Sequence, residues 1–271
     1  MVLQKKRSLV AVLVTVVMTV LRAVVVYYNM EKNNYENDTY YLPDNLTVRI
    51  FNALAIASVV LFVAFALSLL FTKKTSIYHD LSASPAGMLV LAFSMFFVVA
   101  LFAKKLVVTE EVTYSPISLA CVALALVCGL IFLVLGLKSQ KSMPSNATLS
   151  LLMLFPTTFS ALRLVERFMD SNAAPLASSG DYRILGLASL LIFFLYDGKS
   201  YIHPKSAVIF YLSAFLSVFF LLVYSVPNLA LHCFGTFSFD EHAAYSVADI
   251  GISVYICSRM FNAKLKTSIE E

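Results

Sequence analysis

The chain has 271 residues, of which 60% are hydrophobic and 13% are charged, and its formal net charge is +4. A soluble globular domain carries about 25% charged residues, so this composition excludes a soluble enzyme domain, a disordered chain and a disulfide-rich scaffold. Because a membrane-spanning helix needs about 20 mostly apolar residues, the composition predicts an all-α, polytopic membrane helix bundle with short loops.

Eight apolar runs follow one another along the chain, and we interpret each as a membrane helix. They cover residues 8–28, 50–71, 85–103, 116–137, 147–168, 182–197, 206–226 and 239–261. Seven of the eight prolines lie between these runs or at their edges, as expected of a residue that removes a helical N–H. We therefore expect one membrane domain over residues 1–271 with about eight helices. Its longest loop, the outer polar loop 29–49, follows the first run.

The fifth and sixth runs are the weakest of the eight spans by hydropathy. Pro156 lies inside the fifth run, and it predicts a kink that frees the carbonyl of Leu152. The sixth run has the fewest strongly apolar residues. A re-entrant segment at either place would reverse the sidedness of every later run.

The basic residues favour one orientation of the bundle. With the N-terminus inside, 12 of the 20 lysines and arginines lie in inner segments, five lie in outer connections and three lie within the runs. Cytoplasmic loops carry an excess of lysine and arginine, so both termini are predicted to be cytoplasmic. The short loops and the lack of tails favour a bacterial cytoplasmic membrane.

The last run carries a stripe of polar residues along one helix face. Ser238 and Glu241 fit a capping box at its start, and His242, Ser246 and Asp249 follow at intervals of four and three. This spacing places them on one side of a helix. At 1.5 Å per residue Asp249 lies about 16 Å past the cap, near mid-bilayer, where a carboxylate needs a partner inside the bundle.

Arginines of two other runs lie at a comparable depth. Arg163 and Arg167 are four apart in the fifth run, where Glu166 is placed to pair with Arg163, and Arg22 lies in the outer half of the first run. Because side chains lean toward the N-terminus of their helix, these arginines and Asp249 lean toward a common depth. We therefore predict a buried ion pair between Asp249 and either Arg22 or Arg163.

Charges at the ends of runs are interpreted as interfacial. Asp197, near the inner end of the sixth run, is expected at a helix terminus beside the lipid headgroups. Arg167 and Arg183 are expected to be interface anchors rather than ligands.

Three functional interpretations of the internal charges stay open. Buried ion pairs often fix helix register without binding anything, and this structural role is the leading one. The first alternative is a permease for a small solute or ion, in which the charged residues of the first, fifth and last runs line an outer polar cavity. The second alternative is an intramembrane enzyme that uses Asp249 and His242 as an acid–base pair.

The sequence lacks the motifs of several other functional classes. It contains no HExxH or GxSxG motif and no glycine-rich phosphate loop, and its four cysteines do not show metal-ligand spacing. No catalytic, cofactor or metal site is therefore predicted, and neither nucleic acid nor nucleotide is expected as a partner. We expect a multi-pass membrane protein that is not an enzyme, namely an accessory, sensor or scaffold component. Its partners would be the lipid bilayer and another membrane protein.

Overall fold

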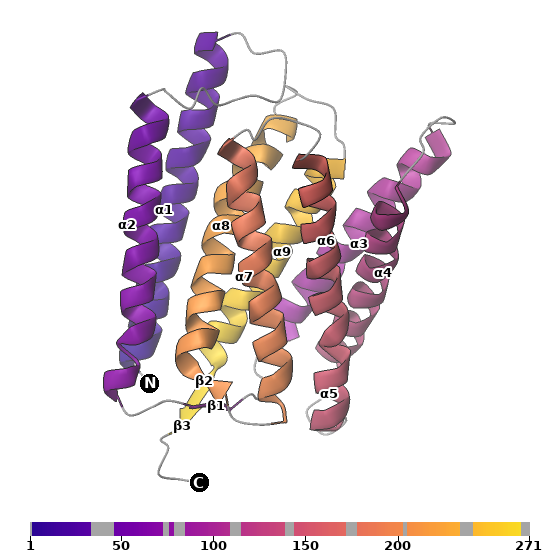
Figure 1. The fold of residues 1–271 in the computed structure, drawn as a ribbon. Coiled ribbons are helices and arrows are strands. Elements are labelled where there is room, and N and C mark those ends of the chain that lie inside the picture. Colours follow the sequence, from indigo (N-terminus) through magenta and orange to yellow (C-terminus); the bar gives the residue numbers. More distant parts are fainter. Residues whose placement is uncertain are drawn as a thin grey trace.

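A computed structural model describes residues 2–33, 46–72, 76–78, 85–108, 115–138, 144–171, 178–202, 205–233 and 241–266. Almost all residues in these ranges are helical, which confirms the predicted all-α bundle (Figure 1). The helices are α1 (Val2–Asn33), α2 (Leu46–Leu67), α3 (Pro85–Val108), α4 (Pro116–Leu137), α5 (Asn146–Leu152), α6 (Leu154–Ser171), α7 (Ser178–Ser200), α8 (Ala207–Cys233) and α9 (Glu241–Asn262), with a 3-10 turn η1 (Leu70–Thr72) after α2.

The helix ends differ from the predicted runs by a few residues in most places. The prediction for the loop 29–49 is too long, because α1 continues to Asn33 and α2 already begins at Leu46; residues 34–45 lie outside the described ranges. The prediction for Pro227 is also wrong. This residue is buried inside α8, which continues to Cys233, so only the Val223 carbonyl loses its helical donor.

The fifth crossing consists of two helices, α5 and α6, separated at Met153. The Met153 N–H still donates to the Leu149 carbonyl at 3.1 Å, but Pro156 has no N–H to offer the carbonyl of Leu152. The helix is interrupted at this point, so the predicted kink is found one turn before the proline. Both α5–α6 and α7 run the length of the bundle (Figure 1), so neither is re-entrant.

The start of α1 and the segment that follows α9 lie at the same end of the bundle (Figure 1), called here the terminal end. Three short strands, β1 (Ser76–Tyr78), β2 (Lys205–Ser206) and β3 (Lys264–Lys266), form a sheet there in the order β2-β1-β3. Both pairings are antiparallel, with Ser76 opposite Ser206 and Ile77 opposite Leu265. The sheet was not predicted; it joins segments that follow α2, precede α8 and follow α9.

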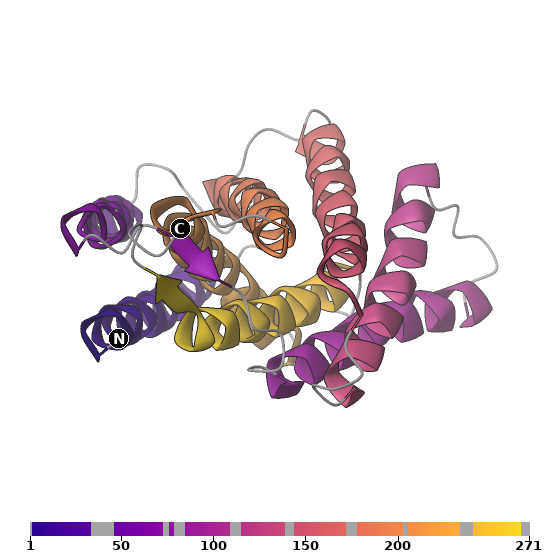
Figure 2. The same ribbon diagram turned by 90° about the horizontal axis from the view of Figure 1, so that it is seen from below.

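Six of the crossings form a closed ring. Around it, α3 packs against α9, α9 against α8, α8 against α7, α7 against α6, α6 against α4, and α4 against α3. Helix α1 packs outside the ring on α8, and α2 packs on α1 and α8 (Figure 2). Helices α6 and α9 are therefore not neighbours in the ring, and they face each other across its interior.

Small residues bring α9 close to α3. A Cβ atom added to Gly251 would lie 2.5 Å from the Ser94 Cβ, and one added to Gly87 would lie 2.7 Å from the Ser258 Cβ. Real Cβ atoms do not approach this closely, so both glycines are needed where the two helices cross. The close crossing fixes which face of α9 is turned toward the ring interior.

Hydropathy and burial agree with a membrane location. Six helical stretches in the described part of the chain are long and apolar enough to cross a membrane, namely α1, α2, α3, α4, α5–α6 and α8. Helices α7 and α9 carry more charge, but their Asp197, Asp249 and Arg259 are buried inside the bundle. Many leucines and valines on the outer helices are exposed, as lipid contact requires. The protein is a multi-pass membrane protein.

Candidate functional site

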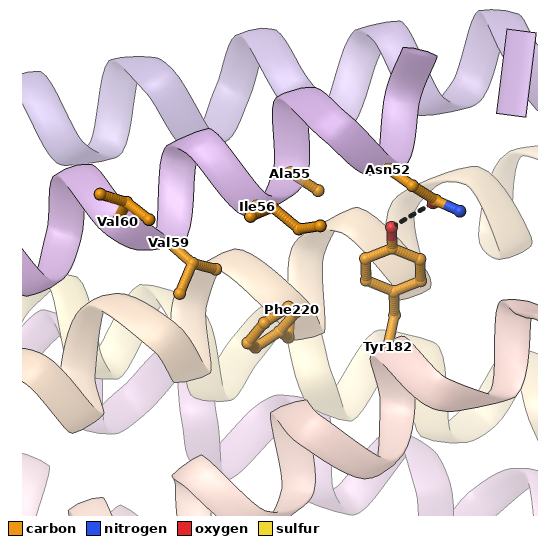
Figure 3. Close-up of a pocket in the computed structure, with 7 residues that line it drawn as sticks. All are labelled: Asn52, Ala55, Ile56, Val59, Val60, Tyr182 and Phe220. Atoms are coloured by element: carbon orange, nitrogen blue, oxygen red, sulfur yellow. Dashed lines mark hydrogen bonds between the residues drawn. The ribbon is translucent and has the colours of Figure 1, made fainter. Parts of the chain in front are cut away.

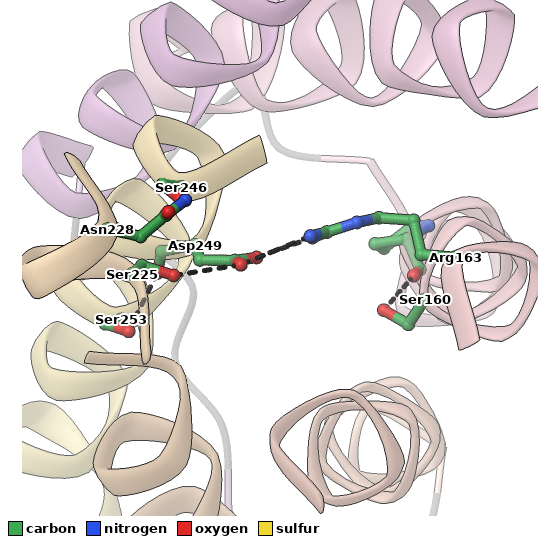
Figure 4. A network of polar contacts seen from close by, with 8 residues as sticks. Ser160, Arg163, Ser225, Asn228, Ser246, Asp249 and Ser253 are labelled. Carbon is green, nitrogen blue, oxygen red and sulfur yellow. Dashed lines mark hydrogen bonds and ion pairs between the residues drawn. The ribbon is translucent and has the colours of Figure 1, made fainter. Parts of the chain in front are cut away.

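An ion pair between Arg163 of α6 and Asp249 of α9 crosses the interior of the ring (Figure 4). The Arg163 Nη1 donates to Oδ1 of Asp249, and Nη2 donates to Oδ2 at 3.2 Å. The two side chains are 0% exposed. A bidentate pair of this kind is among the strongest charge-assisted contacts in proteins, and in a low-dielectric interior each charge depends on the other.

Hydroxyl groups complete the surroundings of Asp249. Ser225 of α8 donates to Oδ2 of Asp249 at 3.1 Å, and Ser253, one turn along α9, donates to the Asp249 backbone carbonyl at 2.8 Å. Nearby, the Asn228 amide donates to the Ser246 hydroxyl at 2.9 Å. Helices α6, α8 and α9 therefore all contribute side chains to this site, called here the upper ion-pair site.

Aromatic rings enclose the arginines of the upper site. The Arg163 guanidinium lies 4.5 Å from the ring centroid of Tyr245, and the Arg183 guanidinium lies 5.5 Å from the same centroid. Cations prefer the face of an aromatic ring, so Tyr245 adds to the stability of both. Arg183 is 4% exposed, which shows that its assignment as an interface anchor is wrong.

A second buried ion pair lies closer to the terminal end. The Arg259 Nη2 of α9 donates to Oδ1 of Asp197 of α7 at 3.0 Å, and the Tyr255 hydroxyl donates to Oδ2 at 2.9 Å. The same Nη2 donates to the Tyr201 hydroxyl at 2.8 Å. Asp197 is 0% exposed and Arg259 is 2% exposed, so the prediction that Asp197 lies among the headgroups is wrong.

Tyr201, which follows the last residue of α7, is neutral in this lower ion-pair site. Burial raises the pKa of its hydroxyl well above the usual value, and the charge of Arg259 opposes that shift only in part. A neutral phenol accepts the N–H of Arg259 without adding a second negative charge beside Asp197. The lower site therefore holds one anion and one cation.

An aromatic layer lies between the two ion-pair sites. Along α9, Tyr255 is about 9 Å and Arg259 about 15 Å from Asp249, at 1.5 Å per residue. The Tyr255 ring packs edge-on against Phe132 of α4 at 5.1 Å between centroids and stacks on Phe194 of α7 at 6.1 Å. Inside the ring of helices, a charged layer is therefore followed by an aromatic layer and then by a second charged layer.

The remaining predicted residues are not joined in one cluster. Arg22 does not bind Asp249, because α1 lies outside the ring; its guanidinium instead lies 4.3 Å from the Tyr182 ring centroid. Glu166 does not pair with Arg163, and it accepts a hydrogen bond from Ser118 of α4 at 2.6 Å.

Arg167 is not part of either ion pair in the described part of the chain. Arg167 is half-buried, and its Nε is buried without a hydrogen bond in the described part of the chain. The side chain of His242 lies outside the described part. Positions 242 and 249 are about 10 Å apart along α9, which does not favour the direct acid–base contact considered above.

The described residues do not offer a metal site. Within them, no group of three histidine, cysteine, aspartate or glutamate side chains is placed to bind an ion. Cys121 and Cys128 are buried free thiols in α4, and Cys121 lies near Glu166, Arg163 and the Tyr245 hydroxyl.

No family model matches the chain, and neither the curated proteins nor the solved structures include a match to it.

Proposed function

We propose that this protein is a non-enzymatic component of a membrane system, with an accessory, sensor or scaffold role, and that its buried charges serve to hold the bundle together. The observation that supports this most directly is the occupancy of the two buried acids. Asp249 is bound by Arg163 and Ser225, and Asp197 by Arg259 and Tyr255. Donors of the protein itself therefore occupy both oxygens of each carboxylate, which leaves neither acid open to a substrate.

The same contacts explain what the charges contribute to the fold. Helix α9 supplies the anion of the upper pair and the cation of the lower pair, while α6 and α7 supply the opposite charges. The two pairs therefore fix both the rotation and the depth of α9 relative to the α6–α7 hairpin. A slip of α9 along its axis would break both pairs and leave four charges buried without partners.

A double-mutant experiment tests the structural role. Asp249→Leu alone leaves Arg163 buried and uncompensated, and is expected to cost about 3–5 kcal/mol. The double variant Arg163→Met/Asp249→Leu replaces the pair by apolar side chains, and it is expected to regain most of that loss. The measurements are thermal stability in detergent and the set of proteins that co-purify. If the double variant is stable but its co-purifying proteins are lost, the charges have a role beyond structure.

A permease is the second candidate, and the layered ring interior is the observation that favours it. Two ion pairs lie at different depths with an aromatic layer between them. They could act as two closed constrictions along one solute pathway, and intramembrane charges often mark such pathways. A cysteine-free background carrying Ser225→Cys tests this. A membrane-impermeant thiol reagent should label Cys at 225 only when Asp249→Asn opens the upper pair; absence of labelling in both backgrounds contradicts the permease.

For the location, we propose a bacterial cytoplasmic membrane with both termini in the cytoplasm. Arg259 and Arg183 are buried in ion-pair and aromatic contacts, so they do not belong in a count of loop charges. Without them, 11 basic residues lie on the inner side and four on the outer side, which keeps the bias. A reporter fused to the C-terminus, active only in the cytoplasm, tests the orientation.

A further inference from the structure

A cleft lies between α2 and α7, with α8 at its floor, on the outside of the ring (Figure 3). Its volume is about 360 Å³, which is within the range of about 300–1,000 Å³ usual for small-molecule sites. Ile56 and Val60 of α2 form one wall and Phe220 of α8 lies at the floor. Ile56 is 66% exposed and Val60 is 62% exposed, so the mouth of the cleft faces the surrounding lipid.

One end of this apolar cleft is polar. The Tyr182 hydroxyl of α7 donates to Oδ1 of Asn52 at 2.6 Å, which leaves the amide N–H groups of Asn52 to find another acceptor. Within the described part of the chain Asn52 donates to no acceptor. An unsatisfied amide in hydrocarbon is costly, so a ligand with an acceptor oxygen would be stabilised here.

Along one face of α2, the side chains become less polar from the start of the helix toward the cleft. Arg49, Asn52, Ile56 and Val60 are spaced three, four and four, so they lie along one helix face. Arg49 is exposed near the start of α2, at the end of the bundle opposite the terminal end. A cation, then an amide donor, then an apolar cleft match the order of phosphate, ester and acyl chain in a glycerophospholipid.

Behind the polar end lies a second positive charge. The Arg22 guanidinium is within 4.3 Å of the Tyr182 ring centroid and 5.5 Å of the Phe51 ring centroid. Its charge makes the local potential more positive in a low-dielectric setting. This favours an anionic lipid over a zwitterionic one at the same position.

We propose that the cleft binds one acyl chain of an anionic phospholipid from the leaflet opposite the terminal end. An ester oxygen of the lipid accepts from the Asn52 amide, and the phosphate lies beside Arg49. The site is separate from the two ion-pair sites, and it does not depend on either candidate function.

The test uses the full chain in phosphatidylcholine vesicles that contain a phosphatidylglycerol with a photoreactive group on its acyl chain. Crosslinking should map to α2, α7 and α8. Val60→Trp fills the mouth of the cleft and should reduce this crosslinking to the level of the bulk lipid contacts. The matched control is Leu54→Trp, an exposed position of α2 that does not line the cleft, and it should crosslink like the parent. Equal crosslinking of the two variants would overturn the proposal.

Two further variants test the polar end without changing the apolar walls. Asn52→Asp keeps an acceptor for Tyr182 but cannot donate and repels a phosphate, so its phosphatidylglycerol crosslinking should fall. Arg49→Gln should lower the preference for phosphatidylglycerol over phosphatidylcholine about fivefold, the factor that corresponds to about 1 kcal/mol per basic residue at a membrane surface. An unchanged preference in both variants would overturn the assignment of an anionic lipid.

Discussion

Arg163 and Asp249 meet across the interior of the helix ring and not between two neighbouring helices. The long arginine side chain spans the distance that the backbones of α6 and α9 leave between them (Figure 4). The pair therefore ties together opposite sides of the ring, and groups that support Asp249 should influence the stability of the whole bundle.

The two serines beside Asp249 should differ in their effect on stability. Ser225→Ala removes a hydrogen bond to the carboxylate, which should cost about 1.5–3 kcal/mol because bonds to charged groups are the stronger ones. Ser253→Ala removes only a bond to the carbonyl of its own helix and should change the free energy of unfolding by less than about 0.5 kcal/mol. Thermal unfolding of both variants in the same detergent measures the difference. Equal effects would contradict this account of the upper site.

The lower site gives a second graded prediction. Tyr255→Phe keeps the aromatic layer and removes one hydrogen bond to Asp197, with an expected loss of about 1.5–3 kcal/mol. Asp197→Leu leaves Arg259 buried without its anion, with an expected loss of about 3–5 kcal/mol. Denaturant titration in mixed micelles should rank the parent, Tyr255→Phe and Asp197→Leu in that order. A reversed order of the two variants would mean that the hydroxyl matters more than the charge.

The crossing of α3 and α9 should not tolerate a methyl group. In Gly251→Ala the new Cβ would overlap Oγ and Cβ of Ser94, and relieving that overlap should cost about 1–3 kcal/mol. Gly136→Ala is the control, because its nearest neighbours are atoms of the flexible Leu89 side chain at 3.0 Å. The two variants are compared by their melting temperatures. If Gly251→Ala melts like Gly136→Ala, the close crossing is not a feature of the folded protein.

The native cysteines report the sidedness of the bundle. Cys233 is exposed at the end of α8, while Cys121 and Cys128 are buried. If both termini are cytoplasmic, an impermeant maleimide added to intact cells should label Cys233, and Cys233→Ser should abolish that labelling. Labelling that requires permeabilised membranes would place this end of the bundle inside.

Much of the fold could be predicted because lipid imposes long apolar runs that prolines separate. The depth of Asp249 also follows from position alone, since a carboxylate so far from either run end needs a cation. The choice between Arg22 and Arg163 could not be made, because it depends on which helices face α9 across the ring. Hydropathy contains no information about that neighbourhood.

The lower ion pair was missed for a different reason. Asp197 and Arg259 lie near the ends of their apolar runs, where a charge is equally compatible with headgroups and with the interior. The spacing of Tyr255 four residues before Arg259 offered a weak indication that this face of α9 is buried. The strands were missed because segments of two or three residues are too short to show an alternating pattern.

The position of α9 after α6 and α7 in the chain has a consequence for membrane insertion. During synthesis, Arg163 and Asp197 enter the membrane before the residues that neutralise them have been made, so seven crossings must wait with two unmatched charges in a medium that disfavours them. Insertion of α9 supplies both counterions in one step, and the strand β3 that follows it completes the sheet. A chain that stalls before α9 would hold Arg163 and Asp197 without these partners, so the insertion of α9 is the step that completes both ion pairs.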